Sequence, residues 1–237
     1  MVISKPDIKV IGFDADDTLW MNEEHYRESE DSFVAMMEPW LTERETRKHL
    51  FAVEMENLGL YGYGAKGFTL SMISAANSIS NRQAGSALIG EIIELGKTLI
   101  DAPMELLPGV SDVLETLHGD YRMIVATKGD LLDQERKLKK SNLEDYFHHV
   151  EIMSDKNPES YRKLVRHLDI KPEEFLMIGN SLKSDVVPVL DIGADAIHIP
   201  AQSTWSHEHV DDTSKIQPYL TLDNFDDLIE VFYKQSN

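Results

Sequence analysis

The sequence predicts an α/β fold in which helices flank a parallel sheet and a separate, all-helical domain is inserted. In the second half of the chain, short apolar segments alternate with helical patterns, which is typical of parallel sheets. From about residue 22 to about residue 100 the pattern is helical throughout, and this stretch is too long for a loop. We therefore expect a sheet domain at 1–20 and 103–237, and a helical cap domain at 21–102 over the sheet edge.

The individual elements follow from local patterns. Five short apolar segments are expected as strands, at 9–13, 122–126, 149–153, 175–178 and 196–199. Helices are expected between the later strands and at the end of the chain, at 109–118, 130–140, 158–168, 184–190 and 225–233. Pro158 suits the first turn of its helix, because proline has no amide proton to leave unpaired there.

The composition argues against several classes of binding partner and of chemistry. With 42 acidic and 23 basic residues the formal charge is −19, so binding to a nucleic acid polymer is not expected. No stretch approaches the ~20 apolar residues of a membrane-spanning helix. The amino-terminal residues lack a signal-peptide layout, so a cytoplasmic location without membrane contact is expected. The chain has no cysteine, which excludes thiol catalysis, and nothing in its composition fixes an oligomeric state.

Asp14 and Asp16 directly follow the first expected strand. They would lie at the carboxyl edge of the sheet, where open α/β sheets bind their ligands. Residues i and i+2 on extended backbone point the same way, so both carboxylates are expected to face one small volume. Such a pair requires a cation or a bound proton. The plain alternative is a strand end that runs into a solvated turn.

Three further strand ends carry complementary polar groups. Thr127 and Lys128 follow the second strand, Lys156 follows the third, and Asn180 and Asp185 follow the fourth. Each has an ordinary explanation as a helix cap, a solvated lysine or an acid favoured by a helix dipole. In a parallel sheet, however, these strand ends point one way, so the groups should converge.

The combined set suits phosphoryl transfer through a covalent intermediate. Such a reaction needs a carboxylate nucleophile, a general acid/base, a metal ion and cations that hold the phosphate. Mg²⁺ prefers a few carboxylates together with water and substrate phosphate, and Asp14 and Asp185 are able to supply these carboxylates.

The motifs Asp14-Ala15-Asp16-Asp17-Thr18, Thr127, Lys156 and Gly179-Asn180-Ser181 with Asp185 resemble those of the haloacid dehalogenase superfamily. The similarity is to its phosphatase branch with a helical C1-type cap, and within it to the nucleotidase and flavin-mononucleotide phosphatase subgroup. It covers residues 9–20 and 103–200, while the cap matches only in position and helical character. The resemblance implies a Rossmann-like core and a Mg²⁺-dependent phosphomonoesterase acting on a small phosphorylated metabolite.

The resemblance also implies catalytic roles. Asp14 would attack phosphorus and become an aspartyl phosphate. Asp16 would protonate the leaving oxygen and later take a proton from the hydrolytic water. Thr127, Lys128 and Lys156 would bind the phosphoryl oxygens.

For the metal ion, the resemblance implies the carboxylates of Asp14 and Asp185 and the backbone carbonyl of Asp16. Asn180 would be a weak or outer ligand, because many members have aspartate there. Asp17 stands where the family often has glycine, and its side chain is expected to point away from the site.

Substrate choice is expected to lie in the cap. Tyr61, Tyr63 and Lys66 belong to the glycine-rich stretch 60–68, which would either stack a ring and meet phosphate or simply connect two cap helices. The segment 14–20 looks most like that of nucleotide phosphatases, so a nucleoside monophosphate is the first expectation and a sugar phosphate the second.

Two rival functions stay open, and two further interpretations are disfavoured. Asp16 argues against a dehalogenase, because a halide leaving group needs no proton. A phosphomutase of the same superfamily and a non-catalytic phospho-ligand-binding protein would both keep the core motifs. His207 and His209 alternate as metal ligands would, but a zinc site needs more ligands, which favours a surface loop.

Overall fold

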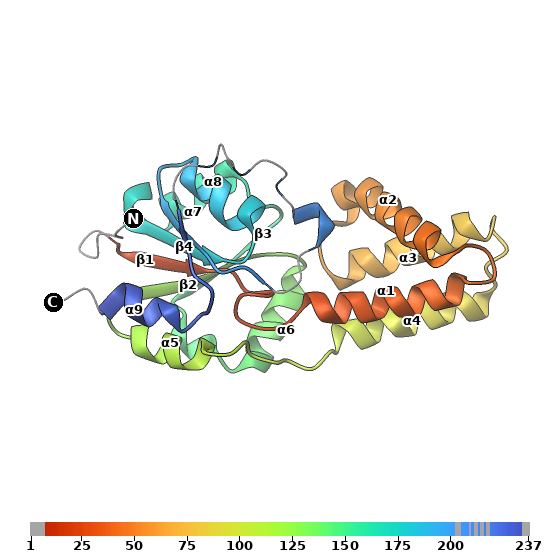
Figure 1. Cartoon of the computed structure of the whole chain (residues 1–237), viewed down its shortest axis with the longest axis horizontal. Coiled ribbons are helices and arrows are strands. Elements are labelled where there is room, and N and C mark those ends of the chain that lie inside the picture. The colour runs from red at the N-terminus through yellow and green to blue at the C-terminus, as the bar shows by residue number, and fades with distance from the viewer. Residues whose placement is uncertain are drawn as a thin grey trace. The chain divides into compact units, whose positions relative to one another are not determined.

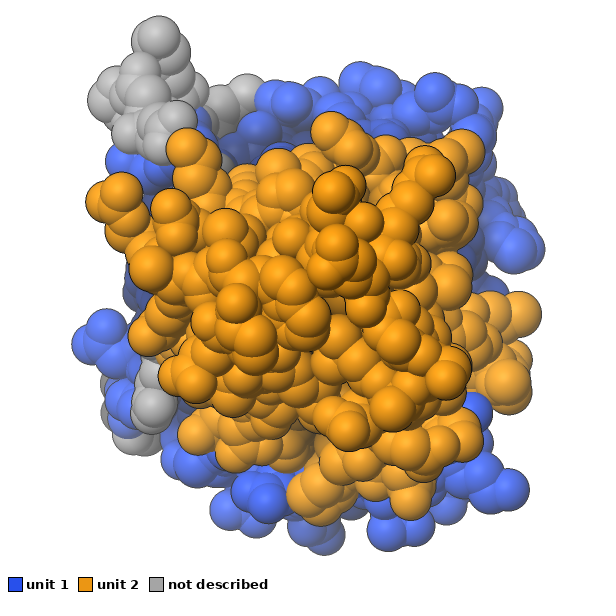
Figure 2. All heavy atoms as spheres, turned by 90° about the vertical axis from the view of Figure 1, so that its right-hand side faces the viewer, with its two compact units in different colours: residues 1–23, 104–128, 136–237 blue, residues 24–103, 129–135 orange. Residues whose placement is uncertain are grey.

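The computed structural model describes residues 8–201, 205–208, 210, 213, 216 and 219–233, and Figure 1 shows its helices and strands. The chain forms two compact units, coloured separately in Figure 2. The first comprises Met1–Glu23, Met104–Lys128 and Arg136–Asn237, and the second comprises Glu24–Pro103 and Gly129–Glu135. The sequence assigns 129–135 to the sheet domain, whereas in the structure this segment groups with the helical unit.

A six-stranded parallel sheet forms the centre of the first unit, which confirms the predicted fold class. The strands are β1 (Val10–Phe13), β2 (Arg122–Lys128), β3 (His149–Met153), β4 (Phe175–Gly179), β5 (Asp195–His198) and β6 (Leu220–Thr221). Their order is β3-β2-β1-β4-β5-β6, and every neighbouring pair is parallel. The carboxyl ends of β1 to β4 therefore lie at one edge. The short β6 is additional to the five predicted strands.

Helices cover both faces of this sheet (Figure 1). They are α5 (Val110–Leu117), α6 (Leu131–Ser141), α7 (Pro158–His167), α8 (Val187–Leu190) and α9 (Asp227–Tyr233). One apolar core contains side chains of α5 and α9, and the other contains side chains of α7 and α8. Along β4, Phe175 and Met177 belong to the α7–α8 core, whereas Leu176 and Ile178 belong to the α5–α9 core. Successive strand residues point to opposite faces, so a sheet covered on both faces requires a continuous apolar run.

The second unit is a group of four helices. They are α1 (Glu23–Met37), α2 (Glu43–Tyr61), α3 (Ala65–Ile79) and α4 (Ser86–Ile100). Its apolar core contains Phe33 and Met37 of α1, Leu50 of α2, Met72 of α3 and Ile92 of α4. The helical character expected for this stretch is therefore present. Among the described residues, no helix is both long enough and apolar enough to cross a membrane.

Helices α3 and α4 approach closely at Gly96. A Cβ atom at this position would lie 2.6 Å from Cγ2 and 2.9 Å from Cβ of Thr69, which is closer than packed carbon atoms allow. Gly90 occupies the same helix six residues earlier, and a Cβ atom there would have nothing within 4 Å. The two glycines therefore differ in packing although they share one helix.

We expect Gly96→Ala to lower the free energy of unfolding by about 1–3 kcal/mol, because the added methyl group overpacks the α3–α4 contact. The matched variant Gly90→Ala should raise it by about 0.5–1 kcal/mol through the higher helix propensity of alanine. Urea unfolding of both variants beside the wild type measures the difference. Equal effects of the two substitutions would contradict this packing.

Candidate active site

Three charged side chains meet at the carboxyl edge of the sheet. Lys156 Nζ lies 2.5 Å from Asp14 Oδ1 and 2.6 Å from Asp185 Oδ1. The side chains of Lys156 and Asp185 are each 1% exposed, and that of Asp14 is 10% exposed. The three residues follow β3, β4 and β1, so the convergence expected of parallel strand ends is present for them. We call this group the buried triad.

Local structure fixes each member of the triad. The amide of Asp14 donates to the carbonyl of Ile178 (2.9 Å), which continues the pairing of β1 with β4. Lys156 precedes Asn157, whose side chain caps α7 by accepting from two backbone amides of its first turn. Asp185 lies in the π-helical turn η3 (Leu182–Val186), and its Oδ2 accepts from the amide of Ser181 (3.0 Å).

Gly179 makes room for Asp185. A Cβ atom at position 179 would lie 2.7 Å from Cβ of Asp185 and would also collide with its carboxyl group. A larger residue at the end of β4 would therefore displace the carboxylate from the triad.

The triad is one positive charge short of neutrality. Burial raises the pKa of Asp14 to about 7, and the nearby Asp185 adds to this rise, while Lys156 opposes it. Burial alone would lower the pKa of Lys156, but Asp14 and Asp185 outweigh it and raise this pKa. Two buried carboxylates thus share a single ammonium group. An additional cation beside them would favour the ionised form of Asp14.

The oxygen donors around the triad fit Mg²⁺. The carboxylates of Asp14 and Asp185 lie together in the triad, and the hydroxyl of Thr18 donates to Asp14 Oδ2 and to Asn180 Oδ1, at 3.3 Å each. Asn180 is thereby placed next to Asp14, as the sequence motif implies. Mg²⁺ selects oxygen ligands of this kind, and its charge would offset the unbalanced carboxylate.

Asp16 has a different environment from Asp14. Its carboxylate accepts from Lys137 Nζ (2.9 and 3.1 Å) and from Trp20 Nε1 (2.7 Å). Lys137 also donates to the side chain of Asn22 (2.6 Å). Lys137 lies within the helix expected at 130–140, and no local pattern in the sequence indicates that it binds Asp16. In the structure this lysine positions the second carboxylate of the motif.

Asp17 organises the start of α1. It adopts a positive φ of 60°, and its carboxylate accepts from the amides of Asn22 and Glu23 at 2.9–3.1 Å. Burial raises its pKa to about 6, while these amides oppose the rise. The extra acid of the motif therefore has a structural task, separate from the triad.

Lys128 is bound to a glutamate that the sequence does not single out. Thr127 is buried at the end of β2, and Lys128 Nζ contacts Ser184 Oγ (2.8 Å) and Glu208 Oε1 (2.5 Å). Glu208 Oε2 also accepts from the hydroxyls of Ser181 (2.5 Å) and Ser184 (2.6 Å). Glu208 thus links the ends of β2 and β4. It is distant in sequence from both, so only the folded chain identifies it.

The aromatic and basic residues considered for substrate binding belong to the second unit. Tyr61 ends α2, and the connection Gly62–Gly64 leads into α3, so the stretch is a connection between cap helices. Lys66 in the first turn of α3 pairs with Asp130 at 2.8 Å. A role of Tyr61, Tyr63 and Lys66 in substrate choice stays a prediction.

Of the histidine pair His207 and His209, the structure describes only His207. His207 lies 3.0 Å from Lys183 Nζ through Nε2, and its ring packs on Trp205 with centroids 4.9 Å apart. His209 lies outside the described residues. These contacts occupy His207 with a lysine and an indole ring, in keeping with the surface-loop reading.

The contribution of Glu208 to stability is expected to depend on pH. Burial alone would raise its pKa, but Lys128, Ser181 and Ser184 lower it from 4.5 to about 2. Because the unfolded chain then binds the proton more readily, the stabilisation is present above about pH 4.5 and is lost toward pH 2. We expect Glu208→Gln to lower the free energy of unfolding by roughly 2–3 kcal/mol at pH 7, with the difference from wild type shrinking below pH 4.5. Denaturant titrations across pH measure this. The exposed Glu144→Gln is the control, and a pH-independent difference for Glu208→Gln would contradict the ion pair.

Comparison with known proteins places this site in a family. A family model described as haloacid dehalogenase-like hydrolase matches residues 8–188. A crystal structure of a haloacid dehalogenase-like family hydrolase from Xanthomonas campestris is 40% identical, covers 87% of each chain and has a TM-score of 0.79. The matched family region contains every member of the buried triad.

Curated relatives match over shorter regions. Glyceraldehyde 3-phosphate phosphatase of Pyrococcus furiosus is 28% identical over 38% of this chain and 40% of its own. Pyrimidine 5'-nucleotidase PynA of Streptococcus pneumoniae is 28% identical over 55% of each chain. The chain thus spans about half the length of these relatives or less. The family match, the parallel sheet and the 40%-identical structure together show that the chain belongs to the haloacid dehalogenase-like hydrolases.

Proposed function

We propose that this protein is a Mg²⁺-dependent phosphomonoesterase that hydrolyses a small phosphorylated metabolite through an aspartyl phosphate on Asp14. The observation that carries the proposal is the buried triad, in which Lys156 joins Asp14 and Asp185 at 2.5 and 2.6 Å. It places a carboxylate beside a fixed cation and leaves it with unbalanced negative charge. This arrangement suits a nucleophile that works with a metal ion.

The reaction has two displacements at phosphorus. Asp14 attacks, the bond from phosphorus to the ester oxygen breaks, and Asp16 gives its proton to the departing oxygen. Water then attacks the aspartyl phosphate, Asp16 takes a proton from that water, and inorganic phosphate leaves with Asp14 restored. Mg²⁺, when bound, supplies a charge that offsets the phosphoryl oxygens.

The remaining residues hold charge in place. Lys156 keeps Asp14 oriented and faces the charge of the transferred group, and Thr127 and Lys128 at the end of β2 bind phosphoryl oxygens. Lys128 is held by Glu208 at 2.5 Å in the structure, so its contact with phosphate would share or replace this ion pair. Asp16 contacts Lys137, which would stabilise the carboxylate left after proton donation.

The substrate proposed is a nucleoside monophosphate first and a sugar phosphate second. Partial support comes from the relatives, whose names specify a pyrimidine nucleotide and glyceraldehyde 3-phosphate. We assign the choice between them to the helical unit, with Tyr61, Tyr63 and Lys66 as the residues to test. A cytoplasmic location agrees with such metabolites.

We expect purified wild-type protein to release phosphate from at least one of a panel of nucleotides, sugar phosphates and an aryl phosphate, only with Mg²⁺. Asp14→Asn should lower turnover at least about 1000-fold, because an amide cannot form the acyl phosphate. Phosphate release measured over the panel gives the rank order of substrates.

Other outcomes point to the rival functions. Equal release by wild type and Asp14→Asn would mean either that a contaminant releases the phosphate or, once a further purification step leaves the release unchanged, that Asp14 is not the nucleophile. Interconversion of a sugar phosphate without phosphate release would show a mutase, and tight binding of phosphate esters without turnover would show a binding protein.

Asp16→Asn should lower the rate by about 10²–10⁴-fold for substrates with poor leaving groups and much less for an activated aryl phosphate. The reason is that a good leaving group departs without a proton. Asp17→Asn is the matched control, since its amide oxygen still accepts from the backbone of α1. Equal losses across leaving groups for Asp16→Asn would count against its role as the acid.

A further inference from the structure

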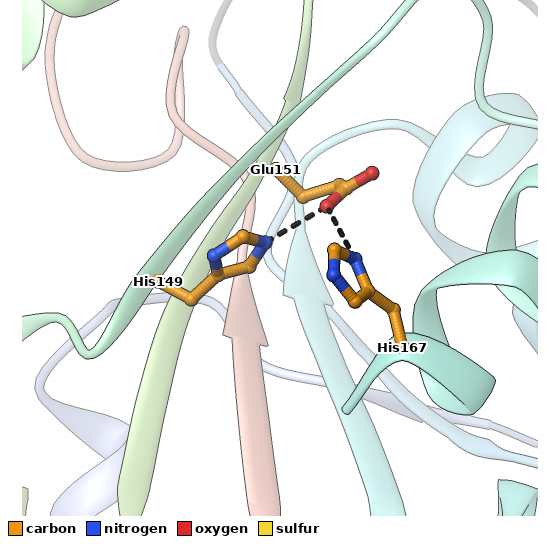
Figure 3. A group of neighbouring side chains, drawn as sticks. All are labelled: His149, Glu151 and His167. Carbon is orange, nitrogen blue, oxygen red and sulfur yellow. Dashed lines mark hydrogen bonds and ion pairs between the residues drawn. The ribbon is translucent and has the colours of Figure 1, made fainter. Parts of the chain in front are cut away.

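A group of three potential metal ligands lies on the first unit, apart from the buried triad. His149 and Glu151 come from β3, and His167 is the last residue of α7. Their side chains point toward one another in Figure 3, with the carboxylate between the two imidazoles. One nitrogen of each histidine and one carboxylate oxygen all lie within 4.8 Å of one another.

The distances between the ligand atoms are close to those between the ligands of a bound metal ion. Glu151 Oε2 lies 2.8 Å from His149 Nε2 and 3.9 Å from His167 Nδ1. Ligands bound tetrahedrally to zinc at about 2.0–2.1 Å stand about 3.3 Å apart, which lies between these two values. His167 is 71% exposed at its side chain, so its ring is able to turn without disturbing the core.

Secondary structure explains why the ligands face one another. His149 and Glu151 are two residues apart on a strand, so their side chains share one face. Strand β3 is at the edge of the sheet, and α7 returns after Lys156 to bring His167 against it. The two imidazole rings meet edge to face, with centroids 5.6 Å apart. Two residues of one strand and one residue at a helix end thus supply the three ligands.

The site is separate from the candidate active site. His149 begins β3, whereas Lys156 follows its carboxyl end. His149 and Met153 are four residue steps apart along the strand, a rise of about 13 Å. None of the three side chains contacts a member of the buried triad in any of the interactions described above.

We propose that His149, Glu151 and His167 bind a first-row transition-metal dication, with Zn²⁺ as the representative ion. Two imidazoles and a carboxylate match the ligand preferences of zinc, nickel and copper, whereas Mg²⁺ prefers oxygen ligands alone. A solvent molecule would complete the coordination, and the formal charge of −19 favours cations. The bound ion ties β3 to α7, the two elements that flank Lys156. It therefore stabilises the first unit.

The test is calorimetric titration of the full chain with Zn²⁺ in saturating Mg²⁺, which keeps zinc away from the triad. We expect one site in the wild type and at least about tenfold weaker binding in His149→Gln/His167→Gln and in Glu151→Gln. His148→Gln is the matched control, because this exposed neighbour lies just outside β3 and should leave affinity unchanged. Zinc should also raise the melting temperature of the wild type and of His148→Gln, but not that of the double variant.

Nuclear magnetic resonance provides an independent readout. Among the nine histidines, the ring signals of His149 and His167 should be those that move when Zn²⁺ is added. The proposal is overturned if the wild type takes up no zinc, or if the folded double variant binds it as tightly as the wild type. Circular dichroism and melting without metal establish that each variant is folded.

Discussion

The rest of the site depends on one interaction, in which the carboxylates of Asp14 and Asp185 share the ammonium group of Lys156. Moving an ion from water into a protein interior costs several kcal/mol, and Lys156 and Asp185 are almost fully buried. Each charge is tolerated only because the others are present. Removal of the lysine would leave two buried carboxylates without a counter-ion, a change of the kind that costs about 3–5 kcal/mol. Asp14, Lys156 and Asp185 are therefore one structural unit.

This unit requires the parallel sheet. Its members follow β1, β3 and β4, which meet at one edge because the strands run in the same direction. The amide of Asp14 continues the pairing with β4, so the position of the carboxylate is set by backbone hydrogen bonds of the sheet itself. A shift of register between β1 and β4 would move Asp14 to the other face. The fold and the proposed chemistry are thus constrained together.

The parts that the sequence predicted are those with local signals. Apolar runs predict β1 to β5, and the polar residues that follow these runs predict the meeting of Asp14, Lys156 and Asp185. The sequence did not predict Lys137 or Glu208. Lys137 reaches Asp16 from the middle of α6, and Glu208 reaches Lys128 across 80 positions of chain. Such contacts depend on how helices and loops pack, and the hydrophobic periodicity of the sequence does not predict that packing.

The same limit applies to the turn after β4, where a helix was expected from residue 184. The structure instead has a π-helical turn at Leu182–Val186, followed by the short α8. In the π-helical turn, Asp185 lies against Gly179 and accepts from the amide of Ser181.

The two proposed groups of metal ligands differ in chemistry as well as in place. The carboxylates of the triad offer oxygen atoms beside a buried ammonium, whereas the group on β3 and α7 offers two imidazole nitrogens and one carboxylate. Transition-metal dications bind most ligand sets more tightly than Mg²⁺ does, so at equal concentrations they would compete for the triad, whereas a large excess of Mg²⁺ would exclude them. The proposed site on β3 and α7, which has softer ligands, would give such ions a preferred position away from Asp14. The difference in ligand type would therefore direct Mg²⁺ to the triad and a transition-metal dication to the group on β3 and α7.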